Sequence, residues 1–259
     1  MSGTVYLVGA GPGAPDLITL RGAQLLARAD IVLHDALVHP DTLALAERAE
    51  KVAVGKRCGA ASTAQRFINR RLVEAARKHR VVVRLKGGDP MLFGRAAEEI
   101  AALEAAGIAW EVVPGITAAL AAAAEVGISL TERGRARSVA FATPRVAPGE
   151  AESDWVRTAA TADTAVLYMG LADAREIASL LIDAGVPPDR PVAVIAEASL
   201  DGARKAVGRL RELESLAQQV APGPAVIMIG EVLRRAAQST VPSDRTARTR
   251  SATILRSTG

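Results

Sequence analysis

Two glycine-rich stretches of the chain have the residue types and spacing to hold a ligand through their backbone. They are GAGPGAPD, residues 9–16, and KGGDP, residues 86–90, and each follows an apolar run. Glycine lets the backbone approach a ligand closely, and in open α/β sheets ligands bind beyond the carboxyl ends of the strands. The first stretch fits the relaxed dinucleotide fingerprint G-x-G-x-x-G/A, with Gly9, Gly11 and Ala14 at the fixed positions. The two stretches therefore predict a small-molecule site at one edge of a sheet.

Two features of the first stretch argue against a dinucleotide. Pyrophosphate is held by the backbone N–H groups of a helix that starts inside the glycine motif. Here Pro12 lacks an N–H group, and the helix that follows has its expected N-cap only at Thr19. A tight loop that brings the backbone close to another ligand is therefore favoured, while an NAD-dependent oxidoreductase stays an alternative.

Charged side chains that could act on a substrate are spread along the chain. They are Asp35 after an apolar run, Lys56 in VGKR, Arg95 and Glu98 one turn apart in an expected helix, and Arg133 in LTERG. A carboxylate in such a place can serve as a base, and an arginine can bind an anionic group. Each charge alone is more typical of a solvated or structural residue, so catalysis requires that several of them converge.

Several reaction classes lack their sequence signatures. The chain has no GxxxxGK[S/T] loop and no GxSxG elbow, which mark P-loop nucleotide-binding proteins and α/β-hydrolases. Its one cysteine, Cys58, and its three histidines do not have the spacing of zinc ligands. Phosphoryl transfer, hydrolysis and metal chemistry are therefore disfavoured, and a single cysteine suits a reducing compartment.

Apolar runs that alternate with helical segments must position these residues. In the first half, such runs predict strands at 4–8, 31–33, 51–55, 81–85 and 110–114. Helices are expected between them at about 20–29, 40–50, 62–79 and 94–106. This alternation predicts an α/β fold with a mainly parallel sheet and helices packed on it.

The second half continues the pattern after the punctuating pair Pro114-Gly115. The expected strands are 138–143, 164–169, 191–199 and 224–230, and the expected helices are 117–126, 173–184 and 209–219. A polar loop is expected at 144–154. We therefore predict one α/β domain at 1–114, a second at 115–236, and a polar, basic tail at 237–259.

Composition narrows the range of partners. The net charge of +4 suits an anionic small molecule or a nucleic acid, but aromatic residues make up only 3%, too few for the stacking platforms of single-strand binding.

The most apolar long window, 110–130, contains two glutamates and Pro114 and does not predict a membrane span. The first residues do not resemble a signal peptide. We expect a cytoplasmic protein that binds neither nucleic acid nor membrane, with a non-catalytic binding module as an alternative.

Several short motifs occur together in the order and spacing of the tetrapyrrole methylases. They are GAGPGAPDLITLRG, DALV, VGKR, RLKGGDPMLFGR, VPGITAALAAAA, LTERG, YMG and GPAVIMIGEV, and the resemblance covers about residues 3–235. Each motif alone is weak evidence, but their joint order is specific. The resemblance implies two α/β domains that differ from the Rossmann-type methyltransferases, with S-adenosylmethionine folded in the cleft between them. It also implies a homodimer.

The resemblance further implies roles for individual residues. Cofactor-binding positions fall at Pro12, Gly87, Gly88, Asp89, Leu92, Thr117, Ala118, Met169, Ala198 and Ala225. The implied catalytic residues are Asp35 as proton acceptor, Lys56 as proton donor, and Arg95. The implied substrate-binding residues are Arg95, Glu98, Arg133 and Met169. No metal is implied, because a sulfonium methyl group is already activated.

The branch of the family that the chain resembles most methylates uroporphyrinogen III, since VGKR followed by KGGDPxxFGR is specific to it. The implied reaction is C-methylation at C2 and C7, which gives precorrin-2 by way of precorrin-1 and leaves S-adenosylhomocysteine. Another corrinoid or tetrapyrrole C-methyltransferase is the alternative. Departures from the common pattern lie at His34, Ala96-Ala97 and Glu132, and a glutamate beside a polyanionic substrate is unexpected.

Overall fold

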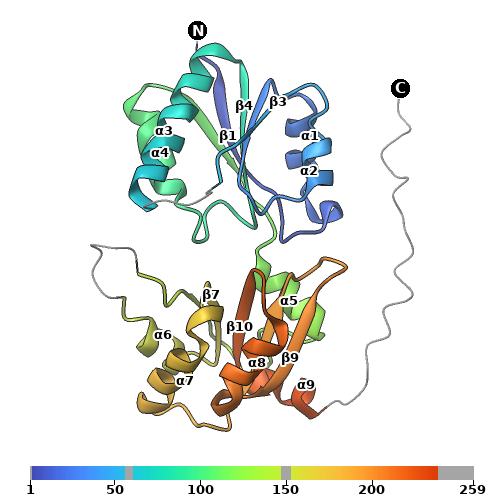
Figure 1. Ribbon diagram of the computed structural model, residues 1–259, viewed down its shortest axis with the longest axis vertical. Helices are drawn as coiled ribbons and strands as arrows, with labels where there is room; N and C mark the ends of the chain where they lie inside the picture. The colour runs from blue at the N-terminus through green and yellow to red at the C-terminus, as the bar shows by residue number, and fades with distance from the viewer. Residues whose placement is uncertain (1, 56–60, 147–152, 239–259) are drawn as a thin grey trace.

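The described part of the chain forms two five-stranded sheets, one above the other in Figure 1. The computed structural model describes residues 2–55, 61–146 and 153–238. In each half, helices cover both faces of the sheet. The α/β fold expected from the alternation of apolar and helical segments is therefore confirmed.

The N-terminal sheet is entirely parallel, with the strand order β3-β2-β4-β1-β5. Its strands are β1 (Thr4–Gly9), β2 (Ile31–His34), β3 (Glu50–Ala53), β4 (Val81–Lys86) and β5 (Ala109–Val113). Helices on one face are α1 (Leu20–Ala27) and α2 (Pro40–Ala44), and those on the other are α3 (Ala61–Lys78) and α4 (Ala96–Ala105). Because the strands are parallel, the loops that follow them emerge at one edge of the sheet.

Local sequence signals explain how the segment after β1 is built. Thr19 caps α1 as expected, since its hydroxyl accepts a hydrogen bond from the Gly22 N–H group at 3.1 Å. Between β1 and α1, the 3-10 helix η1 (Pro15–Leu17) begins with a proline, which cannot donate a backbone hydrogen bond. The delayed start of α1 leaves a long loop at the carboxyl end of β1.

The C-terminal sheet is mixed, with the order β6-β7-β10-β8-β9. Its strands are β6 (Val139–Ala142), β7 (Thr164–Tyr168), β8 (Pro191–Ala196), β9 (Arg204–Arg209) and β10 (Ala225–Gly230). Only β6 and β7 run parallel among its neighbouring strands. Helices α6 (Trp155–Thr161), α7 (Ala174–Asp183) and α8 (Leu213–Val220) cover one face, and α5 (Ala118–Val126) and α9 (Arg234–Gln238) the other. Short 3-10 helices are η2 (Leu171–Asp173), η3 (Leu210–Glu212) and η4 (Glu231–Leu233).

Two elements of this half had no clear apolar signature in the sequence. The strand β9 lies at the edge of the sheet and buries only Ala206. Its sequence, RKAVGR, is therefore mostly polar and does not show the apolar pattern of a strand. The helix α6 is short and buries only Trp155 and Ala159. The helix expected at 209–219 is divided between η3 and α8.

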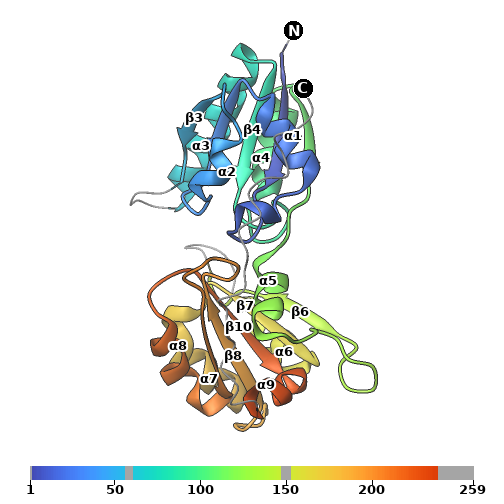
Figure 2. The same ribbon diagram turned by 90° about the vertical axis from the view of Figure 1, so that its right-hand side faces the viewer.

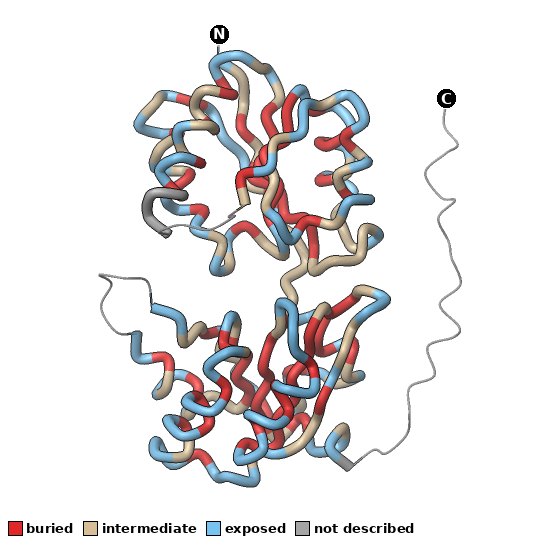
Figure 3. The backbone as a smooth tube through the Cα atoms, viewed as in Figure 1, coloured by how far each residue is buried: buried red, intermediate tan, exposed pale blue. Residues whose placement is uncertain are grey.

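Each half of the chain has its own core. The buried apolar side chains form four clusters, and each cluster draws its members from one half (Figure 3). The chain crosses between the halves after β5 and before α5. We keep Pro114-Gly115 as the proposed domain boundary on this basis. Among the described helices, none is both long and apolar enough to cross a membrane.

Candidate functional site

Three glycine-containing loops meet at the carboxyl edge of the N-terminal sheet. The loops after β1 and β4 pair through their backbones, since Gly88 N–H donates to the Gly11 carbonyl at 2.7 Å and Gly11 N–H donates back at 3.2 Å. The loop after β5 joins them because Gly115 N–H donates to the carboxylate of Asp89 at 2.8 Å. The other carboxylate oxygen of Asp89 accepts from Met91 N–H at 2.8 Å. Asp89 thus ties two loops together.

The glycines of these loops serve two different purposes. A Cβ atom on Gly115 would lie 2.2 Å from the Gly88 carbonyl oxygen, so the backbones pack too closely for any side chain there. A Cβ atom on Gly87 would instead meet only Leu37, at 3.5 Å, and one on Gly88 would have its nearest neighbour at 3.9 Å. The backbone of Gly87 and Gly88 is therefore open on one side, as a ligand contact requires.

The facing edge of the C-terminal sheet carries three more of the expected cofactor positions. Strands β7 and β8 end at this edge and β10 begins there, because β10 is antiparallel to both and Val226 pairs with Tyr168. Met169 follows β7, Ala198 follows β8, and Ala225 opens β10. Residues from distant parts of the sequence are brought together by the register of these strands.

The two edges face each other (Figures 1 and 2), and contacts join them directly. Ala14 N–H, in the loop after β1, donates to Ser199 Oγ at 3.0 Å. The ring of Phe93, in the loop after β4, lies 5.0 Å from that of Tyr168 between ring centroids. The ring of Phe141 also packs against Tyr168 in a T-shaped arrangement, at 6.2 Å between ring centroids. The two halves therefore form one continuous site region.

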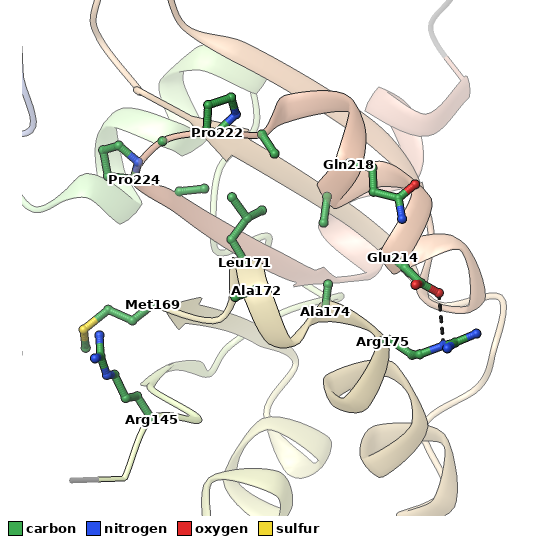
Figure 4. A pocket seen from close by; sticks show the side chains of 14 residues that line it. Arg145, Met169, Leu171, Ala172, Ala174, Arg175, Glu214, Gln218, Pro222 and Pro224 are labelled. Atoms are coloured by element: carbon green, nitrogen blue, oxygen red, sulfur yellow. Dashed lines mark ion pairs between the residues drawn. The ribbon is translucent and has the colours of Figure 1, made fainter.

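A cavity of about 580 Å³ opens beside Met169 and Ala225, between α7 and α8 (Figure 4). Its volume lies in the range of small-molecule sites. Small residues line most of its wall, and Arg145 and Met169 stand together at one end. At the other end, Arg175 Nε pairs with Glu214 at 3.2 Å. This cavity gives a bound molecule room on the C-terminal side of the site.

The hydroxyl of Thr117, an expected cofactor contact, is held by Tyr168. The two side-chain oxygens lie 2.6 Å apart, and Ala119 N–H donates to the same tyrosine oxygen at 3.1 Å. Burial raises the pKa of Tyr168 above its ordinary value of 10.0, so the phenol keeps its proton at neutral pH. Tyr168 therefore links the end of β7 to the start of α5.

Asp35, the expected proton acceptor, lies directly after β2 in contact with a buried charged network. Arg84 donates to its Oδ1 atom at 2.5 Å and, through Nε, to Glu99 at 3.0 Å. Lys86 donates to both oxygens of Glu99, at 3.1 and 3.0 Å. Burial is the main cause that lowers the pKa of Lys86 below 10.5. Lys56, the expected proton donor, lies outside the described residues.

The expected substrate-binding charges are only partly brought together. Arg95 and Glu98 form an ion pair at the start of α4, with nitrogen–oxygen distances of 2.6 and 2.7 Å. Arg133 is exposed in the turn between Glu132 and Ala136. The unexpected Glu132 pairs with Arg135 at 2.7 Å, so its charge is compensated locally. This pairing supplies the physical account of Glu132 that the sequence lacked.

All the expected cofactor positions lie at the two facing edges. Those of the N-terminal edge and the start of α5 are Pro12, Gly87, Gly88, Asp89, Leu92, Thr117 and Ala118, and those opposite are Met169, Ala198 and Ala225. Met169 is exposed, with a left-handed φ of 59°, whereas Ala198 is buried. A ligand would therefore reach the backbone near Ala198 rather than its side chain.

Four residues of the site region were not recognised in the sequence as important. They are Arg84, Lys86, Glu99 and Tyr168. The available signal was Arg84 and Lys86 two residues apart in an apolar strand, which places both on one buried face. Among the described residues, no group of three or more His, Cys, Asp or Glu side chains is placed to hold a metal ion.

Known proteins are similar to this chain over most of its length. A profile of the Tetrapyrrole (Corrin/Porphyrin) Methylases matches residues 4–214. A siroheme synthase of Zymomonas mobilis is 50% identical over 231 residues, which cover 89% of this chain and 49% of that protein. The chain thus spans about half the length of the siroheme synthases it matches.

Solved structures resemble the whole arrangement. The native form of uroporphyrin III C-methyl transferase from Thermus thermophilus has a TM-score of 0.80 and 42% identity, over 90% of this chain and all of that one. The Thermus thermophilus enzyme in complex with S-adenosyl homocysteine has a TM-score of 0.77 and 41% identity, with the same coverage.

Proposed function

The chain belongs to the tetrapyrrole (corrin/porphyrin) methylases, and from this premise we propose that it methylates uroporphyrinogen III with S-adenosylmethionine. The proposed reaction adds methyl groups at C2 and C7 and gives precorrin-2 by way of precorrin-1. The observation that carries the proposal is that edges of two different sheets face each other and are joined by direct contacts. Similarity to siroheme synthases and to a uroporphyrin III C-methyl transferase supports it.

The described residues fit a cofactor with both polar and apolar parts. Gly87 and Gly88 offer open backbone, and Thr117 offers a hydroxyl. Met169 and Ala225 border a cavity with mostly small lining residues, which suits the adenosine part. When bound, the cofactor supplies a methyl group that its sulfonium centre has already activated. The protein then has to align the reacting atoms and handle a proton.

Charged residues of both halves are assigned to the substrate. Uroporphyrinogen III carries eight carboxylates, which arginine guanidinium groups bind well. We assign Arg95 and Arg133 to these carboxylates, with Glu98 orienting Arg95 through their ion pair. Asp35 accepts a proton or a pyrrole N–H hydrogen bond at its carboxylate, and Lys56 is assigned as proton donor. A homodimer in the cytoplasm completes the proposal.

Isotope labelling tests this function. The full chain is incubated anaerobically with uroporphyrinogen III and S-adenosylmethionine labelled with ¹³C in its methyl group, and the product is examined by NMR. Labelled methyl groups at C2 and C7, preceded by a singly methylated species, are expected. Label at another ring position would identify a different tetrapyrrole methylase, and binding of NAD in place of S-adenosylhomocysteine would contradict the proposal.

A further inference from the structure

Three charged side chains are almost completely buried behind Asp35. Arg84, Lys86 and Glu99 are 2%, 2% and 0% exposed. With Asp35 they make two positive and two negative charges. A buried ion-pair network is weak evidence for stability, because well-packed apolar residues often serve as well. The network therefore calls for another explanation.

The guanidinium of Arg84 is fixed on three sides. Its Nε atom donates to Glu99 on α4 at 3.0 Å, and its Nη1 atom donates to the backbone carbonyls of Leu33 and Leu85 at 3.4 and 3.2 Å. Its Nη2 atom is thereby aimed at Asp35 Oδ1, at 2.5 Å. A rigid, planar fork of donors can make all these bonds at once, whereas a lysine ammonium group cannot.

Lys86 and Glu99 complete the support. Lys86 holds both oxygens of Glu99, and Gln65 donates to one of them at 3.3 Å. Glu99 is thus a fixed, fully partnered acceptor for Arg84. The side chain of Asp35 is 30% exposed, while that of Arg84 is 3% exposed. The network therefore ends at the one carboxylate that a substrate can reach.

We propose that Arg84 is a positioning residue that fixes the carboxylate of Asp35 for the substrate, with Glu99 and Lys86 fixing Arg84 in turn. The inference rests on the proposed function, in which Asp35 meets the tetrapyrrole. Arg84 engages Oδ1 and so sets the direction in which Oδ2 faces. A misplacement of about 1 Å at a reacting group can lower a rate by ~100-fold.

A double-mutant cycle between Arg84 and Asp35 tests this role in the full chain. Arg84→Lys keeps the charge but loses the fork, and we expect kcat to fall by about 10- to 100-fold. We expect KM for both substrates, and the Kd of S-adenosylhomocysteine, to stay within about threefold, because Arg84 is almost completely buried. In an Asp35→Asn background, Arg84→Lys should change kcat by less than about twofold. Independent, multiplicative losses would overturn the proposal.

Two further variants separate positioning from stability. Leu103→Ala destabilises α4 from its buried side without touching Asp35, and it should lower Tm while kcat stays near that of the wild type. If Arg84→Lys does not fold, Glu99→Gln replaces it in the cycle, since it weakens the anchor of Arg84 and leaves Asp35 intact. Equal losses of kcat in Leu103→Ala and Arg84→Lys would contradict a positioning role.

Crystal structures of the variants give a readout that does not depend on activity. We expect the Asp35 carboxylate to turn from its wild-type orientation in Arg84→Lys and to keep it in Leu103→Ala. An unchanged Asp35 in Arg84→Lys would overturn the proposal even if the wild type is active. If the wild type transfers no methyl group to uroporphyrinogen III, the proposed function fails, and the orientation of Asp35 still decides whether Arg84 positions it.

Discussion

Arg95 occupies a conformation that is uncommon for a residue with a side chain. Its φ is 56°, in the left-handed region, and its guanidinium pairs with Glu98 three residues further along the helix. Strain of this kind persists where the surrounding structure holds it, and it is frequent at functional sites. The half-exposed ion pair adds little stability by itself. We propose substrate binding as the role of this residue.

Replacement of Arg95 by alanine tests that explanation. Loss of the guanidinium removes a partner for a substrate carboxylate, so methyl transfer should fall by about 100-fold or more. The Kd of S-adenosylmethionine should change by less than about threefold. Arg157→Ala is the matched control, because Arg157 on α6 forms an exposed ion pair of the same spacing with Asp154, just before that helix. Steady-state kinetics and calorimetric titration provide the two readouts, and normal turnover by Arg95→Ala would refute the assignment.

The hydrogen bonds of the Tyr168 hydroxyl group lead to a second prediction for a single residue. Ala119 N–H fills one acceptor position on its oxygen, so we assign the tyrosine proton to Thr117 Oγ1. The threonine hydroxyl can then donate to a ligand. Tyr168→Phe removes about 1 kcal/mol of hydrogen bonding, or about fivefold in the Kd of S-adenosylhomocysteine, while the contact with Phe93 is kept. Tyr6→Phe, which removes the only other tyrosine hydroxyl, should leave the Kd unchanged. Equal Kd values for Tyr168→Phe and the wild type would contradict this assignment.

At the scale of secondary-structure elements, close backbone contacts between glycines fix how the loops of the site pack together. Gly9, Gly88 and Gly115 bring the loops after three parallel strands into backbone contact, and a Cβ atom on Gly9 would lie 2.5 Å from Gly115 Cα. Flexible side chains cannot relieve such contacts, because the neighbouring atoms belong to the backbone. The loops therefore pack as a unit that fixes where Gly87 and Gly88 are open.

Gly115→Ala should disrupt this packing. Its new methyl group would lie 2.2 Å from a carbonyl oxygen, so we expect a loss of about 1–3 kcal/mol or more in the free energy of unfolding, together with weaker cofactor binding. Gly202→Ala is the control, since its Cβ atom would meet its nearest neighbour at 3.4 Å. Urea unfolding measures both variants, and equal stabilities would show that the loops adapt more easily than the distances indicate.

Aspartates tie neighbouring strands together at the starts of strands in both halves. Asp30, just before β2, accepts from the N–H groups of Arg80 and Val81, at the start of β4, at 2.9 and 2.8 Å. Asp163, just before β7, accepts from the backbone and hydroxyl of Ser138, just before β6, at 2.9 Å each. These hydrogen bonds stabilise the ionised form of the two carboxyl groups. They lie at the edges of the two sheets that are opposite the candidate site.

The stability that Asp163 confers should depend on pH. Backbone hydrogen bonding, most strongly from Arg137 N–H, lowers the pKa of Asp163 below its ordinary value of 3.8. Its contribution is therefore fully present above pH 3.8 and is lost as the pH falls through the lowered pKa. Asp163→Ala should be less stable than the wild type at pH 7, and the difference should shrink below pH 3.8. Asp183→Ala serves as control, and a difference that does not vary with pH would contradict the account.

Some helices and strands could be predicted from the sequence more easily than others. Runs such as VVVRL and PAVIMIG are mostly apolar and rich in β-branched residues, and β4 and β10 appear where these runs predict them. The strand β9 was missed because an edge strand with one buried residue leaves no apolar pattern. The loops that carry the site were located from their glycines, but the interlocking of Gly11 with Gly88 depends on strand order, which composition does not encode.

At the scale of the whole molecule, the site exists because two sheets present matching edges. The candidate cofactor residues could be named from motifs, since short motifs are local in sequence. The network behind Asp35 could not be predicted, because Arg84 meets Asp35, and Glu99 meets Arg84, only in three dimensions. Likewise, contact between Phe93 and Tyr168 spans both halves. Because the chain spans about half of the siroheme synthases it matches, its own activity has to be measured directly.

The most direct measurement is the mass of the tetrapyrrole formed when the full chain acts anaerobically on uroporphyrinogen III with S-adenosylmethionine. The account predicts a product heavier by two CH2 units, because each methyl group added is accompanied by the loss of one proton, and two molecules of S-adenosylhomocysteine for each molecule of product. An unchanged tetrapyrrole, from a chain that still binds S-adenosylhomocysteine, would contradict the proposed substrate while leaving the cofactor site in place.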